Sequence, residues 1–520
     1  MFGDKAHVRE FYALCVKNDV SSGIPAFVTL RGAENGHRHR QCYMIAQIFV
    51  CTKKLHDFVM SKNAMTTTSE QEATSRPHNG VGVVLYRWIV GVLVLMTTLC
   101  GPSSAEAAEA YSVQVLHHFE TNSPTGILRG TDGNFYGTTH PSGTNVSGTV
   151  FRATSDGVVT TLFSFSGAIG TDPGGLIEGP DGNFYGVTTF GHGARGTVFR
   201  LTPDGIFAEL HVFEGADGVR PYGRLLYAAD GHLYGTTTFG GAYGCGTVFR
   251  LDATNGALET LYSFAGTNGC QPIGGLEELP NRDIYGSTSL DSAAIFRISS
   301  VGTLTNLLSL STAIGYGFVY LVRAADGNLY GTAAQGGEYN AGTVFKMTPD
   351  GNLSTLSSFA KTNGDFPRGM IEGADANFYG VTEEGGLHGL GTIFRVTPNG
   401  ELTTLVHLDS ENGGRPIARL AEGRDGNLYG VAYRGGKFGS GTFFRLVKVP
   451  QIRIQRQANG ALIIGWDSFA RASYRLEYKP ALTSQNWSAL SELQATDGTT
   501  SLTNSVDSGQ EGYFRVVLVP

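Results

Sequence analysis

The sequence predicts an all-β protein, namely a seven-bladed β-propeller closed by its N-terminal strand and followed by a small β-sandwich. The first observation is a segment that reads DGNLYG at residues 425–430 and recurs in seven full or altered copies. Its tyrosines are spaced by 49, 49, 51, 45, 49 and 50 residues, and a period near 50 residues is typical of propeller blades. The second observation is a segment that reads GTVFR at residues 196–200 and follows every copy in a related form.

Each repeat is predicted to contain four short antiparallel strands. Asp-Gly-Asn between two apolar runs favours a tight hairpin, because Gly and Asn accept the positive φ that such a turn requires. In the second repeat the expected strands are residues 176–179, 184–188, 196–201 and 209–213. Four strands in each of seven repeats are the pattern of a seven-bladed propeller.

The third-strand segment carries a Phe in every repeat, as the second strand carries a Tyr. These rings can fill the wedge between neighbouring blades. The two segments at this period resemble the GloVer tandem repeat of the choice-of-anchor tandem repeat GloVer-containing proteins, over residues 111–446. The resemblance implies an exported, propeller-like repeat protein with a variable C-terminal module. It carries over no catalytic residue. The third-strand copies lie at 148–152, 196–200, 246–250, 293–297, 342–346, 391–395 and 441–445.

Composition agrees with an all-β repeat protein. Gly accounts for 73 of 520 residues, and charged residues make up 16% of the chain against about 25% in typical domains. The formal net charge is -7. Because non-specific nucleic-acid binding requires a basic field, we expect no nucleic-acid partner.

Residues 1–108 are predicted to be a leader with a signal peptide. Within an apolar run at about 81–101, Arg87 precedes the compact stretch 88–96, and small residues at 103–107 offer cleavage sites. Residues 1–64 show no pattern, so one interpretation starts the protein at Met65 and another keeps the whole leader. An uncleaved transmembrane anchor is the alternative for the apolar run. We expect cleavage, no membrane span afterwards, and a periplasmic, cell-surface or extracellular location.

The propeller is expected to occupy residues 109–447. Residues 111–119 read as a fourth strand without a preceding three, whereas residues 416–445 supply three strands without a fourth. The N-terminal strand is therefore predicted to complete the last blade, since ring closure removes exposed sheet edges.

The repeat ends before residue 449, and residues 449–520 alternate in a different pattern. About six short strands are expected there, with Asn459-Gly460 as one turn. This pattern predicts a β-sandwich of fibronectin or immunoglobulin type.

Cys245 and Cys270 are the two cysteines of the part expected to be exported. They lie in loops predicted to emerge on one face of neighbouring blades. An exported protein can keep a disulfide, so we expect this pair to be bridged, and two free buried thiols are the alternative.

Function is expected where the repeats differ, because residues shared by all seven copies are structural. No catalytic, metal or cofactor motif is found, so we expect no catalytic residues, no metal and no cofactor. Arginines gather in the loops leading into first strands or at the starts of those strands, which are expected to line the central channel, and could bind an anionic group. Solvated rim charges are the alternative interpretation. These arginines are Arg220, Arg224, Arg368, Arg415 and Arg419.

The fourth repeat departs most from the others, since its loop before the third strand is short. The next connection carries Tyr316, Phe318 and Tyr320 in place of the usual Pro. These rings predict a notch that could hold a sugar ring or a peptide side chain. A degenerate repeat without function is the alternative.

The sequence therefore predicts an exported, monomeric, non-catalytic binding module or scaffold with a glycan or peptide ligand. One alternative is a propeller-type lyase or glycan hydrolase, which would need paired carboxylates. Another is a purely structural surface protein. Carboxylates on suitable loops are Asp172, Asp365, Glu383 and Glu384.

Overall fold

The structure is a computed structural model with two compact units, Glu109–Val449 and a second formed by Met1–Ala108 with Pro450–Pro520. The predicted signal peptide, its apolar run and the alternative start at Met65 lie outside the described residues. The described residues are 13–16, 30–31, 110–140, 147–267, 269–289, 293–299, 301–449, 452–456, 462–467, 473–480, 486–496, 499–504 and 512–519.

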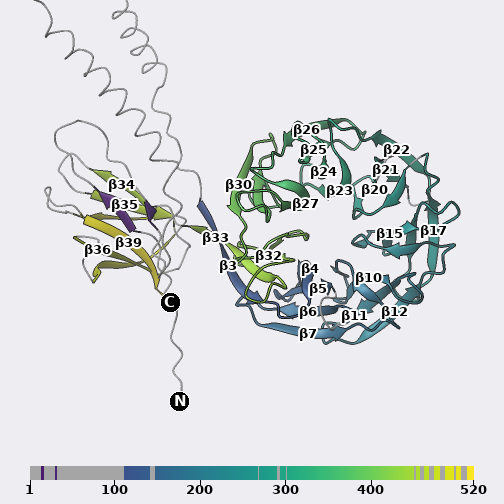
Figure 1. Cartoon of the computed structure of the whole chain (residues 1–520), viewed down its shortest axis with the longest axis horizontal. Helices are drawn as coiled ribbons and strands as arrows, with labels where there is room; N and C mark the ends of the chain where they lie inside the picture. The colour runs from purple at the N-terminus through teal and green to yellow at the C-terminus, as the bar shows by residue number, and fades with distance from the viewer. Residues whose placement is uncertain are drawn as a thin grey trace, which may run out of the picture. The chain divides into compact units, whose positions relative to one another are not determined.

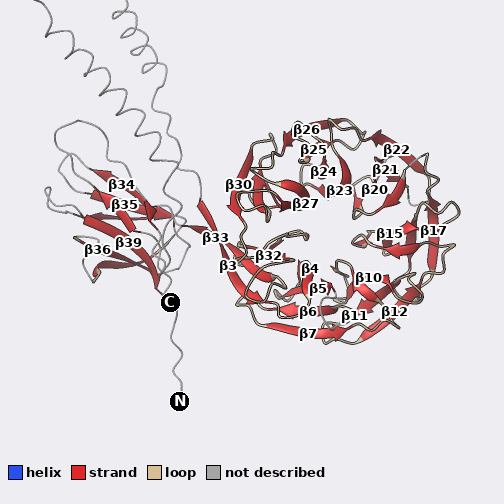
Figure 2. Ribbon diagram, viewed as in Figure 1, coloured by secondary structure: helices blue, strands red, loops and turns tan. Residues whose placement is uncertain are grey.

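Unit Glu109–Val449 consists of seven antiparallel sheets, and its described residues contain no helix. The sheets follow one another around a ring (Figures 1 and 2). The first sheet contains β4 (Ser123–Arg129), β5 (Phe135–His140), β6 (Thr149–Ala153) and β7 (Val159–Ser164), and the second contains β8 (Thr171–Pro173), β9 (Ile177–Glu178), β10 (Phe184–Phe190), β11 (Thr197–Leu201) and β12 (Phe207–Val212). The third contains β13 (Val219–Pro221), β14 (Leu226–Tyr227), β15 (Leu233–Phe239), β16 (Thr247–Leu251) and β17 (Leu258–Ser263). The fourth contains β18 (Cys270–Pro272), β19 (Glu277–Glu278), β20 (Ile284–Ser289), β21 (Ala294–Ile298) and β22 (Leu304–Ser309).

The remaining three sheets of this unit have the same strand order. They contain β23 (Tyr316–Arg323), β24 (Leu329–Gln335), β25 (Thr343–Met347) and β26 (Leu353–Ser358); β27 (Asp365–Glu372), β28 (Phe378–Glu384), β29 (Thr392–Val396) and β30 (Leu402–His407); and β31 (Ala421–Glu422), β32 (Leu428–Ala432), β33 (Thr442–Val449) and β3 (Ala110–His118).

The Asp-Gly-Asn-x-Tyr segment is a hydrogen-bonded turn. In the first repeat, Asp132 Oδ1 accepts from the backbone N of Asn134 at 2.9 Å, and Oδ2 accepts from Tyr136 Oη, also at 2.9 Å. The Tyr ring is buried while its hydroxyl reaches the turn. The fourth repeat has Asn281 at the Asp position, and Tyr285 Oη donates instead to the carbonyl of Pro349 at 3.1 Å. The motif Tyr therefore finds a partner even in the altered copy.

The Gly that follows each motif Tyr is explained by the Phe of the third strand. A Cβ at Gly186 would lie 2.6 Å from Cζ of Phe199, and one at Gly331 would lie 2.4 Å from Cζ of Phe345. These residues are register partners in their sheets. The two repeated segments thus contact each other directly. The Phe ring of the third strand lies over the Gly of the second strand, where a side chain would clash.

Neighbouring sheets pack through aromatic rings. The centroids of Tyr136 and Phe184 are 4.1 Å apart, as are those of Tyr330 and Phe378. Burying such rings contributes about 1.5–3 kcal/mol per side chain. The wedge between sheets is therefore filled largely by the repeated aromatic positions.

The last sheet takes its fourth strand from the N-terminal side of the unit. β3 pairs with β33 over a register that includes Gln114 with Arg445, whose side chains also meet at 2.7 Å. The last sheet then contacts the first, because the rings of Phe135 and Tyr429 have centroids 4.2 Å apart.

The second unit contains two sheets. One has the order β34-β35-β38, and the other β2-β1-β39-β36-β37. Trp466 of the first sheet shares a buried core with Tyr474 and Phe514 of the second. The strand β1 lies within the segment predicted to be a leader, and it extends the sheet beyond β39. The strands are β34 (Ile452–Arg456), β35 (Leu462–Asp467), β38 (Thr499–Asn504), β2 (Leu30–Arg31), β1 (Ala13–Val16), β39 (Gly512–Val519), β36 (Ser473–Lys479) and β37 (Ser488–Gln494).

Candidate functional site

The first strands of the sheets carry two register positions at which the repeats differ. The first is the partner of the motif Tyr, and it is apolar in six repeats and Glu277 in the fourth. The second lies two residues earlier, within β4, β23 and β27 in three repeats and in the segment just before β9, β14, β19 and β31 in the other four. The Tyr-partner residues are Leu128, Ile177, Leu226, Glu277, Val322, Ile371 and Ala421. The earlier residues, here called the inner positions, are Gly126, Gly175, Arg224, Gly275, Tyr320, Gly369 and Arg419.

Arg224, Glu277 and Arg419 meet, and we call them the central cluster. Nη2 of Arg224 donates to Oε1 of Glu277 at 3.0 Å. Nη2 of Arg419 donates to the same oxygen at 3.3 Å and to the carbonyl of Leu321 at 2.8 Å. These residues belong to the third, fourth, fifth and seventh repeats. First strands, or the segments that lead into them, therefore converge on this cluster from repeats far apart in the sequence.

The glycines at the inner positions leave room for the two arginines. A Cβ at Gly369 would lie 2.7 Å from Cγ of Arg419. A Cβ at Gly275 would lie 3.8 Å from Cβ of Arg224 and 3.9 Å from Nη2 of Arg419. The space left by glycines at some inner positions is thus occupied by the arginine side chains from others.

The central cluster carries two guanidinium groups on one carboxylate. The charge of Arg419 lowers the pKa of Arg224 to about 10, burial adds to the effect, and Glu277 opposes it. Nε of Arg224 is buried without a hydrogen-bond partner among the described residues. An unpaired buried donor destabilises a fold by about 1–3 kcal/mol. The protein alone therefore leaves this cluster short of acceptors and of negative charge.

A second group, the Glu383 cluster, is balanced in charge. Oε2 of Glu383 accepts from Nε of Arg368 at 2.9 Å, and Oε1 accepts from Nε of Arg415 at 3.1 Å. Nη2 of Arg415 also donates to Glu384 at 3.0 Å. Burial would raise the pKa of Glu383, but the two arginines outweigh it and hold the pKa below its ordinary value. Glu383 is thus an ion-paired carboxylate and a poor general acid.

The three aromatic residues predicted to line a notch lie on β23, where two of them contact Arg368. The guanidinium of Arg368 lies 4.9 Å from the ring centroid of Phe318, and its Nη1 donates to Tyr320 Oη at 2.8 Å. Tyr316 Oη instead donates to Oδ1 of Asn340 at 3.3 Å. The shortened loop at 290–292 lies outside the described residues, so the notch stays a prediction.

Tyr222 is an aromatic residue that the sequence pattern did not single out. It is 46% exposed and lies two residues before Arg224. Loss of solvent around the ring raises the pKa of Tyr222 to about 12, and the neighbouring Tyr320 adds to this effect while Arg368 opposes it. Tyr222 therefore lies near Arg368 and Glu383 of the Glu383 cluster, and it precedes Arg224 of the central cluster by two residues along the chain.

Sequence reasoning grouped the arginines but missed Glu277. The structure assigns Arg224 and Arg419 to one cluster and Arg368 to the other. A signal for Glu277 was present, because the same position is apolar in the other six repeats. It becomes visible once the register with the motif Tyr is known.

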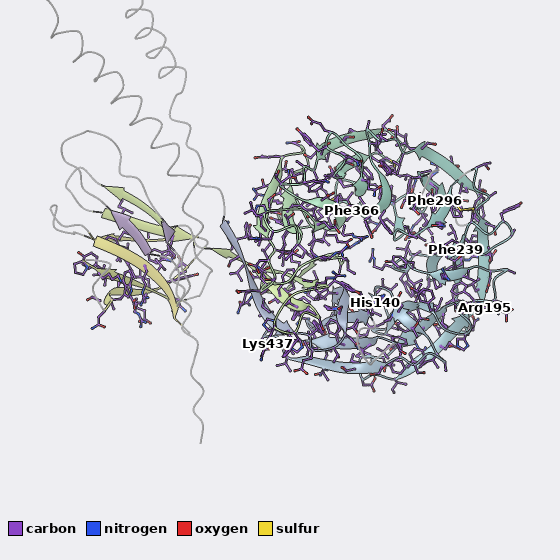
Figure 3. All side chains as sticks on the ribbon, in the orientation of Figure 1. His140, Arg195, Phe239, Phe296, Phe366 and Lys437 are labelled. Carbon is purple, nitrogen blue, oxygen red and sulfur yellow. A yellow bond between two sulfur atoms is a disulfide. The ribbon has the colours of Figure 1, made fainter. Side chains whose placement is uncertain are left out.

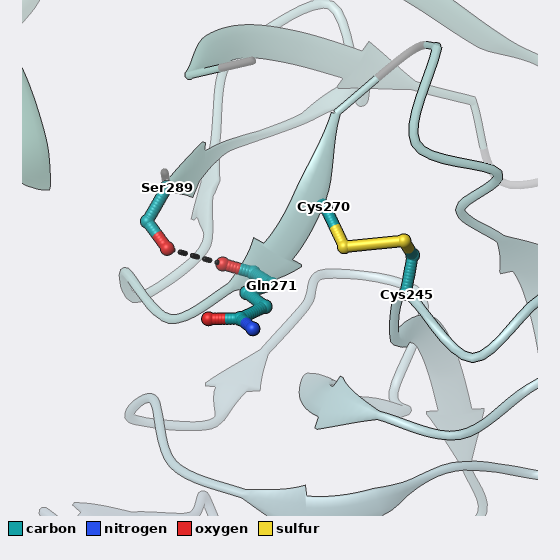
Figure 4. The surroundings of a disulfide bond; sticks show 4 residues. All are labelled: Cys245, Cys270, Gln271 and Ser289. Atoms are coloured by element: carbon teal, nitrogen blue, oxygen red, sulfur yellow. Dashed lines mark hydrogen bonds between the residues drawn. A yellow bond between two sulfur atoms is a disulfide. The ribbon is translucent and has the colours of Figure 1, made fainter. Parts of the chain in front are cut away.

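Cys245 and Cys270 form a disulfide with a Cα–Cα distance of 4.7 Å (Figure 4). Cys245 lies in the loop before β16, and Cys270 begins β18. The bond therefore joins the third sheet to the fourth. Gln271, which follows, accepts at its carbonyl from Ser289 Oγ at 3.0 Å.

Metal and membrane features were also sought in the described part of the chain. There, no group of three or more His, Cys, Asp or Glu side chains could hold a metal ion. The same residues include no helix long and apolar enough to cross a membrane.

Several solved structures are similar to this chain at low identity. The extracellular domain of BT4673 from B. thetaiotaomicron has a TM-score of 0.46 and 12% identity, over 76% of this chain and 55% of that one. Puromycin hydrolase has a TM-score of 0.40 and 14% identity, over 67% and 59%. A luciferin-regenerating enzyme has a TM-score of 0.37 and 12% identity, over 54% and 93%. This chain thus spans little more than half of the first two.

No curated protein matches the chain. The family model described as the Gloeobacter/Verrucomicrobia repeat matches twice, at residues 106–294 and 289–455. These residues contain the seven sheets and both repeated segments, and the match confirms the resemblance drawn from them. With about two thirds of its length matched, the chain belongs to the Gloeobacter/Verrucomicrobia repeat family.

Proposed function

We propose that this chain is an exported seven-bladed β-propeller, closed by β3, that binds a glycan or peptide ligand at the centre of the ring. The observation that carries the proposal is the set of inner positions. Four repeats have Gly there, whereas the others have Arg224, Tyr320 and Arg419. Since Gly serves the fold in four copies, the three large side chains are available for recognition.

Export is supported by two features. The apolar run at 81–101 has the layout of a signal peptide. The disulfide between Cys245 and Cys270 belongs to an oxidising compartment. The C-terminal unit, with two sheets around one core, fits an immunoglobulin-like or fibronectin-like module that accompanies the ring.

The test is a glycan and peptide array probed with the full chain and with a variant in which all three inner side chains become Gly. The variant restores the residue that four other repeats use, so it should fold. We expect a saturable hit with the unchanged protein and its loss in the variant. Binding that is equal in both proteins would place the site elsewhere. Absence of any hit at micromolar concentration would favour a purely structural surface protein.

A further inference from the structure

We propose that the central cluster binds the carboxylate of an acidic sugar, a uronate. This inference rests on the proposed function and names the ligand class for that site. It depends on three observations, namely where the repeats depart from their pattern, how many donors the cluster leaves unused, and which exposed aromatic residue lies on the same chain segment as Arg224.

The members of the central cluster are all departures from the repeat. Arg224 and Arg419 replace the Gly of four other copies, and Glu277 replaces an apolar residue. They come from the third, fourth and seventh repeats, with sequence separations of 53 and 142 residues along their two ion pairs. Seven-fold packing requires none of these side chains, yet they meet within hydrogen-bond distance. Such a meeting is expected for a site and not for drift at a tolerant surface.

The cluster has more donors than acceptors. Each guanidinium has five N–H groups, and together the two donate three hydrogen bonds within the described residues, two to Glu277 and one to Leu321. One carboxylate between two guanidiniums leaves one positive charge. The side chains of Arg224 and Arg419 remain 35% and 21% exposed, so solvent reaches both. A planar carboxylate matches the remaining forks because it can accept two parallel hydrogen bonds from a guanidinium.

An exposed aromatic residue two positions before Arg224 in the chain favours a sugar over a bare anion. Tyr222 is 46% exposed, and its ring can cover the apolar face of a pyranose while the sugar carboxylate meets Arg224. The Glu383 cluster does not offer the same opportunity, since its two arginines already face two carboxylates.

The experiment is isothermal titration of the full chain at low salt with digalacturonate and with its neutral counterpart galactobiose. We expect digalacturonate to bind at least about tenfold more tightly, since a lost charged hydrogen bond weakens binding by that order. Arg224→Gly and Arg419→Gly should each weaken digalacturonate binding about tenfold or more. Glu277→Gln removes the competing carboxylate and should tighten binding, an effect that a merely structural role of Glu277 would not produce.

Arg195→Ala is the matched control, because it removes one exposed arginine at the outer margin of the ring (Figure 3). Digalacturonate affinity should be unchanged in this variant. If a Gly variant fails to fold, Arg224→Lys keeps the charge and removes the fork, and it should still weaken binding.

Three results would overturn the inference while leaving the proposed function intact. They are equal binding of galactobiose and digalacturonate, digalacturonate binding that survives both Gly variants, and binding of triglutamate in place of digalacturonate. If neither these probes nor any glycan or peptide of the array binds, the proposed function itself fails.

Discussion

At the residue scale, the Asp of the turn in the fifth repeat accepts four hydrogen bonds from three residues. Oδ2 of Asp326 accepts from Asn328, Tyr330 and Lys346, and its Oδ1 accepts from the backbone of Asn328. Burial alone would raise the pKa of Asp326, but these hydrogen bonds outweigh it and lower the pKa to about 2. The turn therefore depends on an ionised carboxylate as well as on the φ preference of Gly.

This dependence predicts an acid-sensitive contribution to stability. Because the folded-state pKa of Asp326 lies below its ordinary value of 3.8, its contribution is present above pH 3.8 and is lost as pH falls toward 2. The free energy of unfolding of the unchanged protein should exceed that of Asp326→Asn at pH 5, and the difference should shrink toward pH 2. Denaturant titrations along this pH series measure it.

The altered fourth copy supplies a control for the acid prediction. Asn281 accepts the equivalent hydrogen bond from the backbone of Asp283 at 3.1 Å, and an amide does not titrate in this range. The loss caused by Asn281→Ala should therefore be constant from pH 5 to pH 2. If the loss of unfolding free energy caused by Asp326→Asn were also constant with pH, the acid sensitivity would not come from the Asp326 carboxylate.

The Gly that follows the motif Tyr makes a second prediction at this scale. Gly331→Ala should destabilise the protein by about 1–3 kcal/mol or more, because its Cβ would lie 2.4 Å from Cζ of Phe345. Adding Phe345→Leu should cost less in the Ala variant than in the unchanged protein, so the double-mutant cycle should be non-additive. Gly327→Ala is a control for backbone strain alone, since that Gly has φ +82° and no atom within 4 Å of the added carbon. Equal stability of Gly331→Ala and the unchanged protein would refute the contact.

At the element scale, strand positions followed from the sequence but partners across the ring did not. The alternation of apolar residues and the turn segments placed the four strands of the second repeat within two residues of β9 to β12. The sequence also placed Arg224 and Arg419 in the loops leading into first strands or at the starts of those strands, and both precede their strands by two residues. It could not show that they share Glu277, because that meeting depends on how strands 53 and 142 residues apart converge. Local propensity does not encode such distances.

A further irregularity that pattern reading did not reveal is a register shift of one residue between the third and fourth strands. It occurs in all seven sheets, for example at Val198 and Phe199 in the second and at Val344 and Phe345 in the fifth. A bulge of this kind increases the local twist of a strand. Alternation alone cannot reveal it, because fourth strands are only half-buried.

The disulfide gives a prediction at the scale of two neighbouring sheets. Cys245 and Cys270 are separated by 25 residues, and closing a loop of that length stabilises a fold by about 3–4 kcal/mol in the chain-entropy model. Changing both to Ala should lower the free energy of unfolding by that order. A reductant should lower the denaturant midpoint of the unchanged protein and leave that of the double variant unaffected. Equal denaturant midpoints with and without reductant would contradict the bond.

At the scale of the whole repeat unit, β3 joins the N-terminal side of the unit to its last sheet. Its pairing with β33 supplies the fourth strand of the last sheet, and Pro124 and Phe135 of the first sheet then contact Gly441 and Tyr429 of the last. The sequence predicted this strand from a simple imbalance, since one end of the repeats had an extra strand and the other lacked one.

Removing residues 110–118 should therefore lower the melting temperature of the ring by about 5 °C or more, because β33 would become an open edge. A chain that ends at Val449 and keeps β3 is the control, and its ring should melt as in the full chain. Calorimetry of both shortened chains checks the prediction. Unchanged melting without β3 would show that the ring does not need it.

The pairing of Gln114 with Arg445 also has a consequence in time. The two residues are 331 positions apart, and chains grow at about 5–20 residues per second. The ribosome therefore finishes the first of these strands roughly 20–60 s before the second exists. Throughout that interval the backbone N–H and C=O groups of β3 that later pair with β33 lack these partners, as at any unpaired strand edge. The first strand of the repeat unit thus waits for its partner until the last repeat has been made.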